Sequence, residues 1–399
     1  MRQFDVLIIG GGLIGCASAY YLAQRGAKVL LAEKNDINSL ASGQNAGSLH
    51  FQLEHRLIEH GDTLSEQFSQ IIPLNQLAAN LWGNLEDELS EQMEVSMKGG
   101  LMAAMTDEEV ALLKKKHALE QSHGLETQLI TAKEALDIAP YLNSDIQAAA
   151  YFPKEGHANP RLVTPAFARA AIRNGATIES QCEVTLLVSK KNGWSAELKT
   201  VDNPQTESIH ASMVLNAAGA WAAHSALLAN IHLPVFPVPL MMNVTEGTSL
   251  FLPHLLQRAG AKLSMKQVAA GNILIGGGWA SRFCKKNGKP DLTQRPTLIQ
   301  ENIRQNLSLA AELVPQVGPL NLLRCWTGIV GITSDQLPLL GAVPNFPGYY
   351  VATGGSGFTL GPVYATLISE LMMAGKTSHD ISLYSPGRFG HINNFMAEG

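Results

Sequence analysis

The sequence predicts an α/β (α+β) fold in which a domain with a parallel, dinucleotide-binding sheet is combined with a second domain. Three observations support this prediction. An apolar strand, a glycine-rich turn and a helix open the chain, a second short strand ends in an acid, and a strand, a glycine loop and a long helix lie near the end. With 399 residues, 46 % of them hydrophobic, the chain is long enough for about two domains with sizeable cores.

The opening segment FDVLIIGGGLIGCASAYYLAQRGAKVLLAEK has the pattern of a nucleotide-binding βαβ unit. Residues 5–9 are continuously apolar, as in a strand buried on both faces of a parallel sheet. In the turn, Gly10 permits the tight bend, Gly12 lets the backbone approach a pyrophosphate, and Gly15 lets the helix pack closely on the strand. The N-terminus of the following helix directs free N–H groups at the phosphates.

The second strand, residues 28–32, ends at Glu33. An acid at this place accepts hydrogen bonds from a ribose diol and disfavours a 2′-phosphate. The turn and the acid together therefore predict NAD or FAD rather than NADP.

Later segments favour FAD over NAD. The small and polar stretch LASGQNAGSLH follows the second strand and suits an extended backbone that runs along a long cofactor. The apolar strand in MVLNAAGAWA ends at Ala218 and Gly219, which indicates a second close approach of the backbone. In GYYVATGGSGFTLGPVYATLISELMM, a helix beginning at Gly361 would direct its positive end toward a ring that becomes anionic on reduction.

Charge and cysteine content exclude several classes of function. A net charge of −5 gives no general attraction to nucleic acid or to an anionic membrane, and the lysines of LKKKHAL are interpreted as a solvated helix face. The four cysteines form no CxxC pair, so we expect no metal site and a reducing, cytoplasmic location. We also expect no signal peptide and no transmembrane segment.

Six segments, in their order and spacing, resemble the D-amino-acid-oxidase-like family of FAD enzymes, of the glycine oxidase and sarcosine oxidase type. They are the opening segment, ASGQNAGSL, YFPKEGHANPRLVTPAFARAAIRNGA, VLNAAGAWA, WTGIVGITSDQLPLLG and GYYVATGGSGFTLGP. Of these, NAGSLH and RCWTGIVGITSDQLPLLG look most like the flavin subunits of heteromeric opine and hydroxyproline dehydrogenases and of hydrogen cyanide synthase.

The resemblance implies a Rossmann-like FAD-binding domain interleaved with a substrate domain built on a mixed or antiparallel sheet. The prolines of HLPVFPVPLMM support a crossing between domains. We expect the FAD-binding domain to comprise residues 1–92, 150–232 and 324–399, and the substrate domain residues 93–149 and 233–323.

The resemblance also implies the residues that hold FAD, which we expect to be bound non-covalently. They are Gly10, Gly12, Leu13, Ile14, Gly15, Glu33, Lys34, Ser42, Gly43, Asn45, Ala46, Gly47, Leu49, Val184, Ala218, Gly219, Trp221, Gly328, Gly355, Gly357, Phe358 and Thr359. A cysteine near Cys325 is bonded to the flavin in some relatives, and that bond is an open alternative here.

The implied reaction is hydride transfer from a C–H beside an amine nitrogen to the flavin, followed by hydrolysis of the imine. The substrate would be an amino acid, imino acid, opine or other secondary amine. In one alternative, electrons pass to a dye-type acceptor or to partner subunits, one larger and nucleotide- or FAD-containing and one small with an iron–sulfur cluster, through which the chain would reach a membrane. The others are a self-contained oxidase producing hydrogen peroxide and a non-catalytic flavoprotein subunit with structural FAD.

The substrate-binding residues depart from the simplest relatives. Val330 stands where those enzymes carry an arginine that pairs with the substrate carboxylate. A larger or N-substituted amino acid anchored elsewhere is therefore expected. The candidate anchors are His50, Arg282 and Arg324, with His50 and Arg324 as catalytic candidates, and the candidate cavity walls are Trp279 and Phe358. A structural histidine, a structural ion pair and aromatic core packing are the alternatives for these residues.

Overall fold

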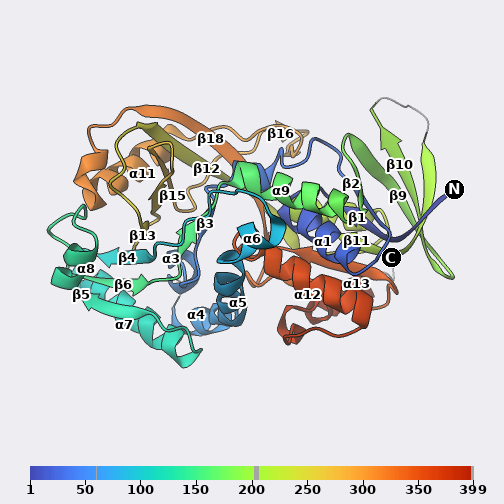
Figure 1. Cartoon of the computed structure of the whole chain (residues 1–399), viewed down its shortest axis with the longest axis horizontal. Helices are drawn as coiled ribbons and strands as arrows, with labels where there is room; N and C mark the ends of the chain where they lie inside the picture. Colours follow the sequence, from blue (N-terminus) through green and yellow to red (C-terminus); the bar gives the residue numbers. More distant parts are fainter. Residues whose placement is uncertain (60, 202–205, 397–399) are drawn as a thin grey trace.

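The computed structural model describes residues 1–59, 61–201 and 206–396, and two sheets of eight strands dominate that part of the chain. Figure 1 shows the two sheets toward opposite ends of an elongated molecule. The mixed α/β fold predicted from the sequence is confirmed.

The first sheet contains the strands of the predicted nucleotide-binding domain. Its strands are β1 (Arg2–Ile9), β2 (Val29–Ala32), β8 (Thr177–Glu179), β9 (Cys182–Lys190), β10 (Gly193–Thr200), β11 (Glu207–Asn216), β19 (Leu339–Ala342) and β20 (Tyr349–Thr353). Their order is β19-β20-β11-β1-β2-β8, with β10 also paired to β11 and β9 paired to β10. Strand β1 lies parallel to both of its neighbours, β2 and β11, as the βαβ pattern predicts.

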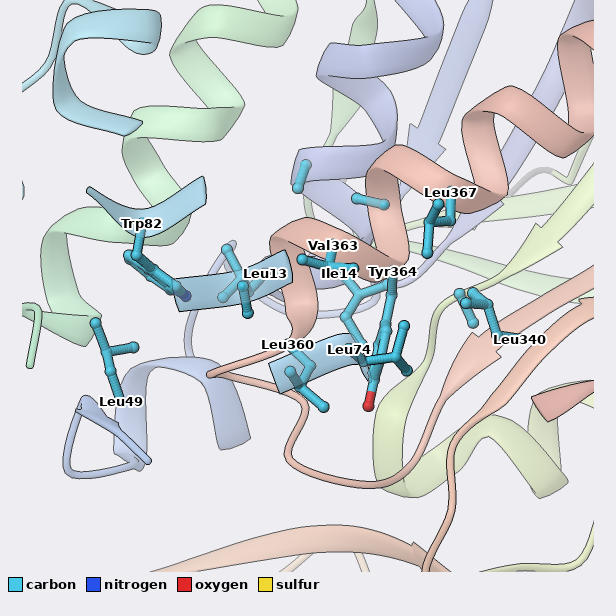
Figure 2. Packing of buried hydrophobic residues seen from close by; sticks show 14 of the residues in the cluster. Leu13, Ile14, Leu49, Leu74, Trp82, Leu340, Leu360, Val363, Tyr364 and Leu367 are labelled. Atoms are coloured by element: carbon cyan, nitrogen blue, oxygen red, sulfur yellow. The ribbon is translucent and has the colours of Figure 1, made fainter. Parts of the chain in front are cut away.

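Strand β1 is buried on both faces, which explains its uninterrupted apolar run. Val6 and Ile8 belong to the core that helices α1 (Leu13–Gln24), α9 (Pro160–Arg173) and α12 (Gly361–Ala374) cover. Leu7 and Ile9 belong to a second core on the opposite face of the sheet. Figure 2 shows the first of these cores, where Leu13 and Ile14 of α1 lie beside Leu360, Val363 and Tyr364 of the α12 segment.

The turn between β1 and α1 tolerates only glycine at two positions. Gly10 has a φ of +111°, in the region that disfavours side chains. A Cβ atom placed on Gly15 would lie 1.9 Å from the carbonyl oxygen of Gly10. The close contact of helix and strand therefore depends on the absence of that atom.

The second sheet is mixed and mostly antiparallel, as expected for the substrate domain. Its strands are β4 (Gly100–Ala104), β5 (Gln128–Thr131), β6 (Ala148–Phe152), β12 (Val235–Gly247), β13 (Leu255–Arg258), β14 (Ser264–Gln267), β15 (Asn272–Gly276) and β18 (Leu322–Thr333). Their order is β18-β12-β15-β14-β13-β4-β6-β5, and β13 and β4 form its parallel pair. One face of the sheet packs on α8 (Ala132–Ile138) and α11 (Gln300–Leu313).

The other elements connect the sheets or cover their edges (Figure 1). They are α2 (Ala41–Gln44), β3 (Ser48–Leu49), α3 (His55–Ile58), α4 (Asp62–Ser69), α5 (Ile72–Trp82), α6 (Leu85–Leu89), α7 (Asp107–Ser122), β7 (Gly156–His157), η1 (Gly219–Trp221), α10 (Ala222–Leu227), β16 (Lys285–Lys286), β17 (Lys289–Pro290), η2 (Pro315–Val317), η3 (Ser382–Tyr384), η4 (Pro386–Phe389) and α13 (Gly390–Met396). In the described part of the chain, no helix is both long and apolar enough to cross a bilayer.

Two of the predicted domain boundaries lie inside strands of the second sheet. The boundary at 149/150 lies within β6, and the boundary at 323/324 lies within β18. Strand β18 pairs with β12 along most of its length. The division into two interleaved domains stays a prediction, but β18 connects its two parts as one continuous strand.

Candidate active site

A cavity of about 1670 Å³ extends from the first sheet to the second. Its lining begins at Ile9 and Ala32, the ends of β1 and β2, and reaches Leu240, Ser264 and Val330 on the second sheet. Sites for small ligands usually measure about 300–1,000 Å³. This cavity is therefore large enough for a dinucleotide and a further small molecule.

The N-terminus of α1 forms a cradle at one end of the cavity. Gly10, Gly11 and Gly12 all line it. A Cβ atom on Gly12 would lie 2.9 Å from Oγ of Ser42, and this hydroxyl oxygen accepts a hydrogen bond from the Leu13 N–H at 2.9 Å. The cradle fits a diphosphate, because the backbone is exposed to the cavity at the positive end of a helix.

Glu33 lies beside this cradle with its carboxylate fixed. One oxygen accepts a hydrogen bond from the Gly11 N–H at 2.6 Å, and the other accepts one from the Asn35 N–H at 2.7 Å. Glu33 also lines the cavity, where the remaining lone pairs can accept ribose hydroxyls. The residues at this end therefore fit the ADP half of FAD.

Replacing Glu33 with alanine is expected to weaken FAD binding about 10- to 100-fold, because two charge-assisted hydrogen bonds to the ribose are lost. The measurement is the dissociation constant of FAD added back to the flavin-free protein. The matched control is Glu183→Gln, since Glu183 also lines the cavity but is half-exposed and pairs with Lys34. Equal FAD affinity in Glu33→Ala and the parent protein would contradict this role for Glu33.

Most residues expected to hold FAD line the cavity. They are Gly10, Gly12, Leu13, Ile14, Glu33, Lys34, Ser42, Asn45, Ala46, Gly47, Val184, Ala218, Gly219, Trp221, Gly355, Gly357, Phe358 and Thr359. Four others lie behind the lining: Gly15, Gly43, Leu49 and Gly328. Gly15 and Gly43 serve close backbone packing, since a Cβ on Gly43 would lie 2.1 Å from the Asn38 carbonyl oxygen.

The glycine loop before α12 is tied to the N-terminal part of the chain. The indole N–H of Trp82 donates to the Thr359 carbonyl oxygen at 2.7 Å, and the Trp82 ring lies 5.6 Å from the Phe358 ring between centroids. The hydroxyl of Thr359 donates to the Ser48 carbonyl oxygen at 3.2 Å. These contacts hold two segments on opposite sides of the cavity in register.

The residues expected to bind substrate divide into two groups. His50, Val330 and Phe358 line the cavity. Trp279, Arg282 and Arg324 lie outside its lining. The Trp279 indole donates to the Lys262 carbonyl oxygen, Arg282 is exposed beside Thr297, and Arg324 is exposed beside Val244 near the start of β18.

Cys325 and the other cysteines are free thiols in the described residues. Cys325 is half-buried on β18 and is not part of the cavity lining. Burial raises the pKa of its thiol, which lowers its nucleophilicity at neutral pH.

An arginine cluster at the far end of the cavity has no counterpart among the residues predicted from the sequence. Arg56 donates to Oε1 of Gln336 at 2.8 Å, to Oε1 of Glu54 at 2.9 Å and to Oγ of Ser356 at 3.0 Å. All four residues line the cavity. Gln336 has a φ of +58°, a strained conformation that often marks functional sites.

The charge of Arg56 is matched by Glu54. Burial alone would raise the pKa of Glu54, but Arg56 and His50 outweigh it and the pKa lies below its usual value. Glu54 is therefore ionised at neutral pH. The pair gives this end of the cavity a guanidinium without a large excess of positive charge.

Behind His50, a buried network of charged and polar side chains fixes the chain. Glu155 accepts hydrogen bonds from the Phe51 N–H at 2.7 Å, the Gln52 N–H at 2.8 Å and the Gln52 side-chain amide at 2.9 Å. Lys116 donates to Oε1 of Gln52 at 2.9 Å and lies 2.7 Å from Oε1 of Glu120. Burial raises the pKa of Glu155, against the opposing effects of His50, Gln52 and Lys116.

The interpretation of LKKKHAL as a solvated face is wrong for its last lysine. Lys114 and Lys115 are exposed, but the Lys116 side chain is fully buried. Lys116 is three residues after the buried Leu113 and four before the buried Glu120, so these three residues share the inner face of α7.

A second buried lysine, Lys266, lies directly behind the wall of the cavity. It is 1 % exposed, and its Nζ donates one long hydrogen bond, of 3.3 Å, to the Ala158 carbonyl oxygen. A Cβ on Gly47, which lines the cavity, would lie 3.0 Å from this Nζ. Burial lowers the pKa of Lys266 to about 7, although Glu94 opposes the shift.

Lys266 should make the stability of the protein depend on pH. The unfolded residue is protonated below 10.5, whereas the folded one stays neutral down to about 7. Stability is therefore lost as the pH falls from 10.5 to 7, at about 1.4 kcal/mol per pH unit, or roughly 5 kcal/mol in all.

We expect Lys266→Met to be more stable than the parent protein at pH 7 and to lose this advantage near pH 10.5. The measurement is urea unfolding of both proteins at pH 7, 9 and 10.5, where the difference between them isolates this one group. A difference that is the same at every pH would show that Lys266 titrates normally in the folded state.

The missed residues carried weak signals in the sequence. In KLSMKQ, polar Ser264 and Lys266 alternate with apolar Leu263 and Met265, which is the pattern of a strand with one polar face toward a cavity. The charged stretch EHRLIEH follows His50 directly, in a part of the chain that already approaches the cofactor.

The fold and the cavity together define an α/β enzyme that binds a dinucleotide beside a separate substrate chamber. A family model described as FAD dependent oxidoreductase (DAO) matches residues 5–371, and the chain belongs to this family. Its cofactor is accordingly FAD, and at the level of the family its activity is oxidation of small amines or amino acids.

Similar proteins cover the whole chain. The sequence is 29 % identical to the glycine oxidase of Geobacillus kaustophilus (strain HTA426), over 100 % of both chains. It is 24 % identical to one of the subunits of the opine oxidase of Rhizobium meliloti, over 98 % of each chain. Among solved structures, L-proline dehydrogenase from P. horikoshii has a TM-score of 0.83 and 26 % identity over 98 % of both chains.

Proposed function

We propose that this chain is the catalytic flavin subunit of a dehydrogenase that oxidises the C–N bond of an N-substituted amino acid. The observation that carries the proposal is a cavity that joins the ADP cradle to a chamber containing Arg56. Arg56 is the arginine that lines this cavity among the residues that the structure describes. A planar guanidinium suits bidentate binding of a carboxylate.

The remaining wall of the chamber favours a substrate with a substituent. Val238, Leu240 and Val330 line the cavity from β12 and β18, and Val238 lies opposite Val330 in the register of the two strands. This surface is apolar and leaves room at the position where simpler relatives are expected to carry arginine. An N-alkyl or longer amino acid would bury carbon atoms against it.

His50 is placed to receive the proton that an ammonium substrate must lose before oxidation. Its Nε2 lies 2.9 Å from Oγ of Ser264, while its Nδ1 is buried and has no hydrogen-bond partner among the described residues. With the ring hydrogen on Nε2, the hydrogen bond to Ser264 orients the ring and Nδ1 accepts a proton. Bound FAD supplies the hydride acceptor for the C–H beside the nitrogen.

The electron acceptor is proposed to be a partner subunit. The relative from Rhizobium meliloti is named as one subunit of an opine oxidase, which supports a heteromeric enzyme. No group of three or more metal-ligating side chains occurs in the described part of this chain, so an iron–sulfur cluster would belong to a small partner, beside a larger nucleotide- or FAD-containing one.

The test is anaerobic mixing of the FAD-loaded protein with a panel of amines, while the flavin absorbance is followed. The panel contains glycine, sarcosine, D-alanine, D-proline, hydroxyproline and several opines. We expect an N-substituted amino acid to bleach the flavin, with slow recovery in air and fast recovery with a dye. Fast recovery in air would instead show a self-contained oxidase, and bleaching by no amine would contradict the catalytic proposal.

A further inference from the structure

A buried amide on the second sheet faces the cavity without a partner. Gln257, on β13, is 4 % exposed and lines the cavity. Its Nε2 makes no hydrogen bond within the described part of the chain. Buried donors are almost always satisfied, because leaving one unpaired is costly. An unpaired donor on a cavity wall is therefore a place where a ligand oxygen would bind.

Ser264 adds a second donor beside this amide. Gln257 and Ser264 are directly opposed on the antiparallel strands β13 and β14, so their side chains lie on the same face of the sheet. With the ring hydrogen of His50 on Nε2, Oγ of Ser264 accepts from the ring and its own hydroxyl hydrogen remains free to donate. The two side chains then present N–H and O–H groups together.

These donors differ in place and chemistry from the rest of the chamber. Strands β12 and β18 contribute the apolar wall of Val238, Leu240 and Val330. Arg56 lies among the C-terminal loops, held by Gln336 and Ser356. The chamber thus has a cationic part, an apolar part and a neutral donor part.

We propose that Gln257 and Ser264 form a subsite for an acceptor oxygen on a second polar group of the substrate, a carboxylate or a carboxamide carried on the substituent of the amine. This inference rests on the proposed function, in which Arg56 holds the first carboxylate. It narrows the substrate class to amines that carry two oxygen-bearing arms.

The test measures binding alone, with thioether analogues of glycine derivatives in which sulfur replaces the amine nitrogen and blocks oxidation. The second arm is carboxymethyl, carbamoylmethyl or the isosteric isobutyl group, and binding to the FAD-loaded protein is followed by flavin absorbance and calorimetry. We expect one of the two polar analogues to bind about 10- to 100-fold more tightly than the isobutyl analogue, since a donor pair then meets an acceptor.

Three variants make the test specific. Gln257→Leu should abolish this preference by weakening the polar analogue while leaving the isobutyl analogue unaffected or tighter. Gln257→Glu should reject the carboxylate more than the carboxamide, because a donor becomes an anion. The matched control is Gln305→Leu, since Gln305 is exposed on α11 and distant from the cavity lining; this variant should retain the parent preference.

The comparison of analogues within one variant is independent of any general loss of folding. A parent protein without preference, or a preference that survives in Gln257→Leu, would overturn the subsite. If the polar analogue binds with the expected preference while no amine bleaches the flavin, the subsite stands and the proposed oxidation fails.

Discussion

Replacing Lys116 with methionine is expected to lower the free energy of unfolding by about 3–5 kcal/mol. The Lys116 and Glu120 side chains are both fully buried, and their charged atoms lie 2.7 Å apart. Removing the ammonium leaves the Glu120 carboxylate in the interior without its counter-charge. It also leaves Oε1 of Gln52 without the hydrogen bond from Nζ.

The measurement is urea unfolding of the FAD-loaded protein, and two further variants identify the cause. Lys115→Met is the matched control, because Lys115 is the preceding residue but is exposed in its pair with Asp62; its effect should stay within about 0.5 kcal/mol. The double variant Lys116→Met with Glu120→Gln should recover much of the loss. The glutamine oxygen can still accept from the Leu53 N–H, and no buried charge remains.

A small effect of Lys116→Met, equal to that of Lys115→Met, would show that the buried pair contributes little. The expected large effect would also be felt at the active site. Glu120 and Glu155 bind the backbone N–H groups of Phe51, Gln52 and Leu53, which connect His50 to Arg56. Loosening this segment should raise the KM for the amine more than it lowers FAD affinity, because the ADP cradle is built from other residues.

The ADP half of the site could be predicted from sequence because its parts are neighbours along the chain. Strand β1, the glycine turn, helix α1 and Glu33 occupy the first 33 residues, and each has a conformational requirement visible in residue type. The same locality made the strands and the start of α12 at Gly361 predictable.

The substrate half joins residues that no spacing connects. Arg56 contacts Gln336 and Ser356, which lie 280 and 300 positions later. Arg324 is a sequence candidate because it shares a strand face with Trp326. The Trp326 indole does reach the Gln44 carbonyl oxygen, but Arg324 lies two residues nearer the start of the strand and is exposed. Alternation gives the face of a strand, but it does not give the point at which the strand leaves the cavity.

Lys116 shows a related limit of composition. Three consecutive lysines on a helix must point in three directions, about 100° apart, so one of them can reach the inner face. Its burial depends on Glu120 one turn later and on Gln52 from a distant segment. Only the second of these contacts is beyond local sequence, and an i,i+4 pair of opposite charges is as common on a solvated face.

Replacing Arg56 with methionine is expected to lower kcat/KM for the amine about 10³-fold, with FAD still bound. A guanidinium that holds a substrate carboxylate by two charge-assisted hydrogen bonds contributes about 3–5 kcal/mol, and methionine keeps the apolar stem while removing both donors. Arg56→Lys should recover only part of the loss, because an ammonium lacks the planar pair of N–H groups. The measurement is the rate of flavin bleaching at increasing amine concentration, with the flavin-to-protein ratio recorded for each variant.

The control must separate carboxylate binding from support of the loop, since Arg56 also holds Gln336 and Ser356. Arg388 offers that control: it binds both oxygens of Asp335, at 2.7 and 3.1 Å, in the same loop but outside the cavity lining. If Arg56 binds substrate, Arg56→Met should lose discrimination between an amino acid and the corresponding amine without a carboxylate, while Arg388→Met keeps it. If both variants lose activity alike and both keep that discrimination, Arg56 only supports the loop, and the carboxylate is bound by another residue.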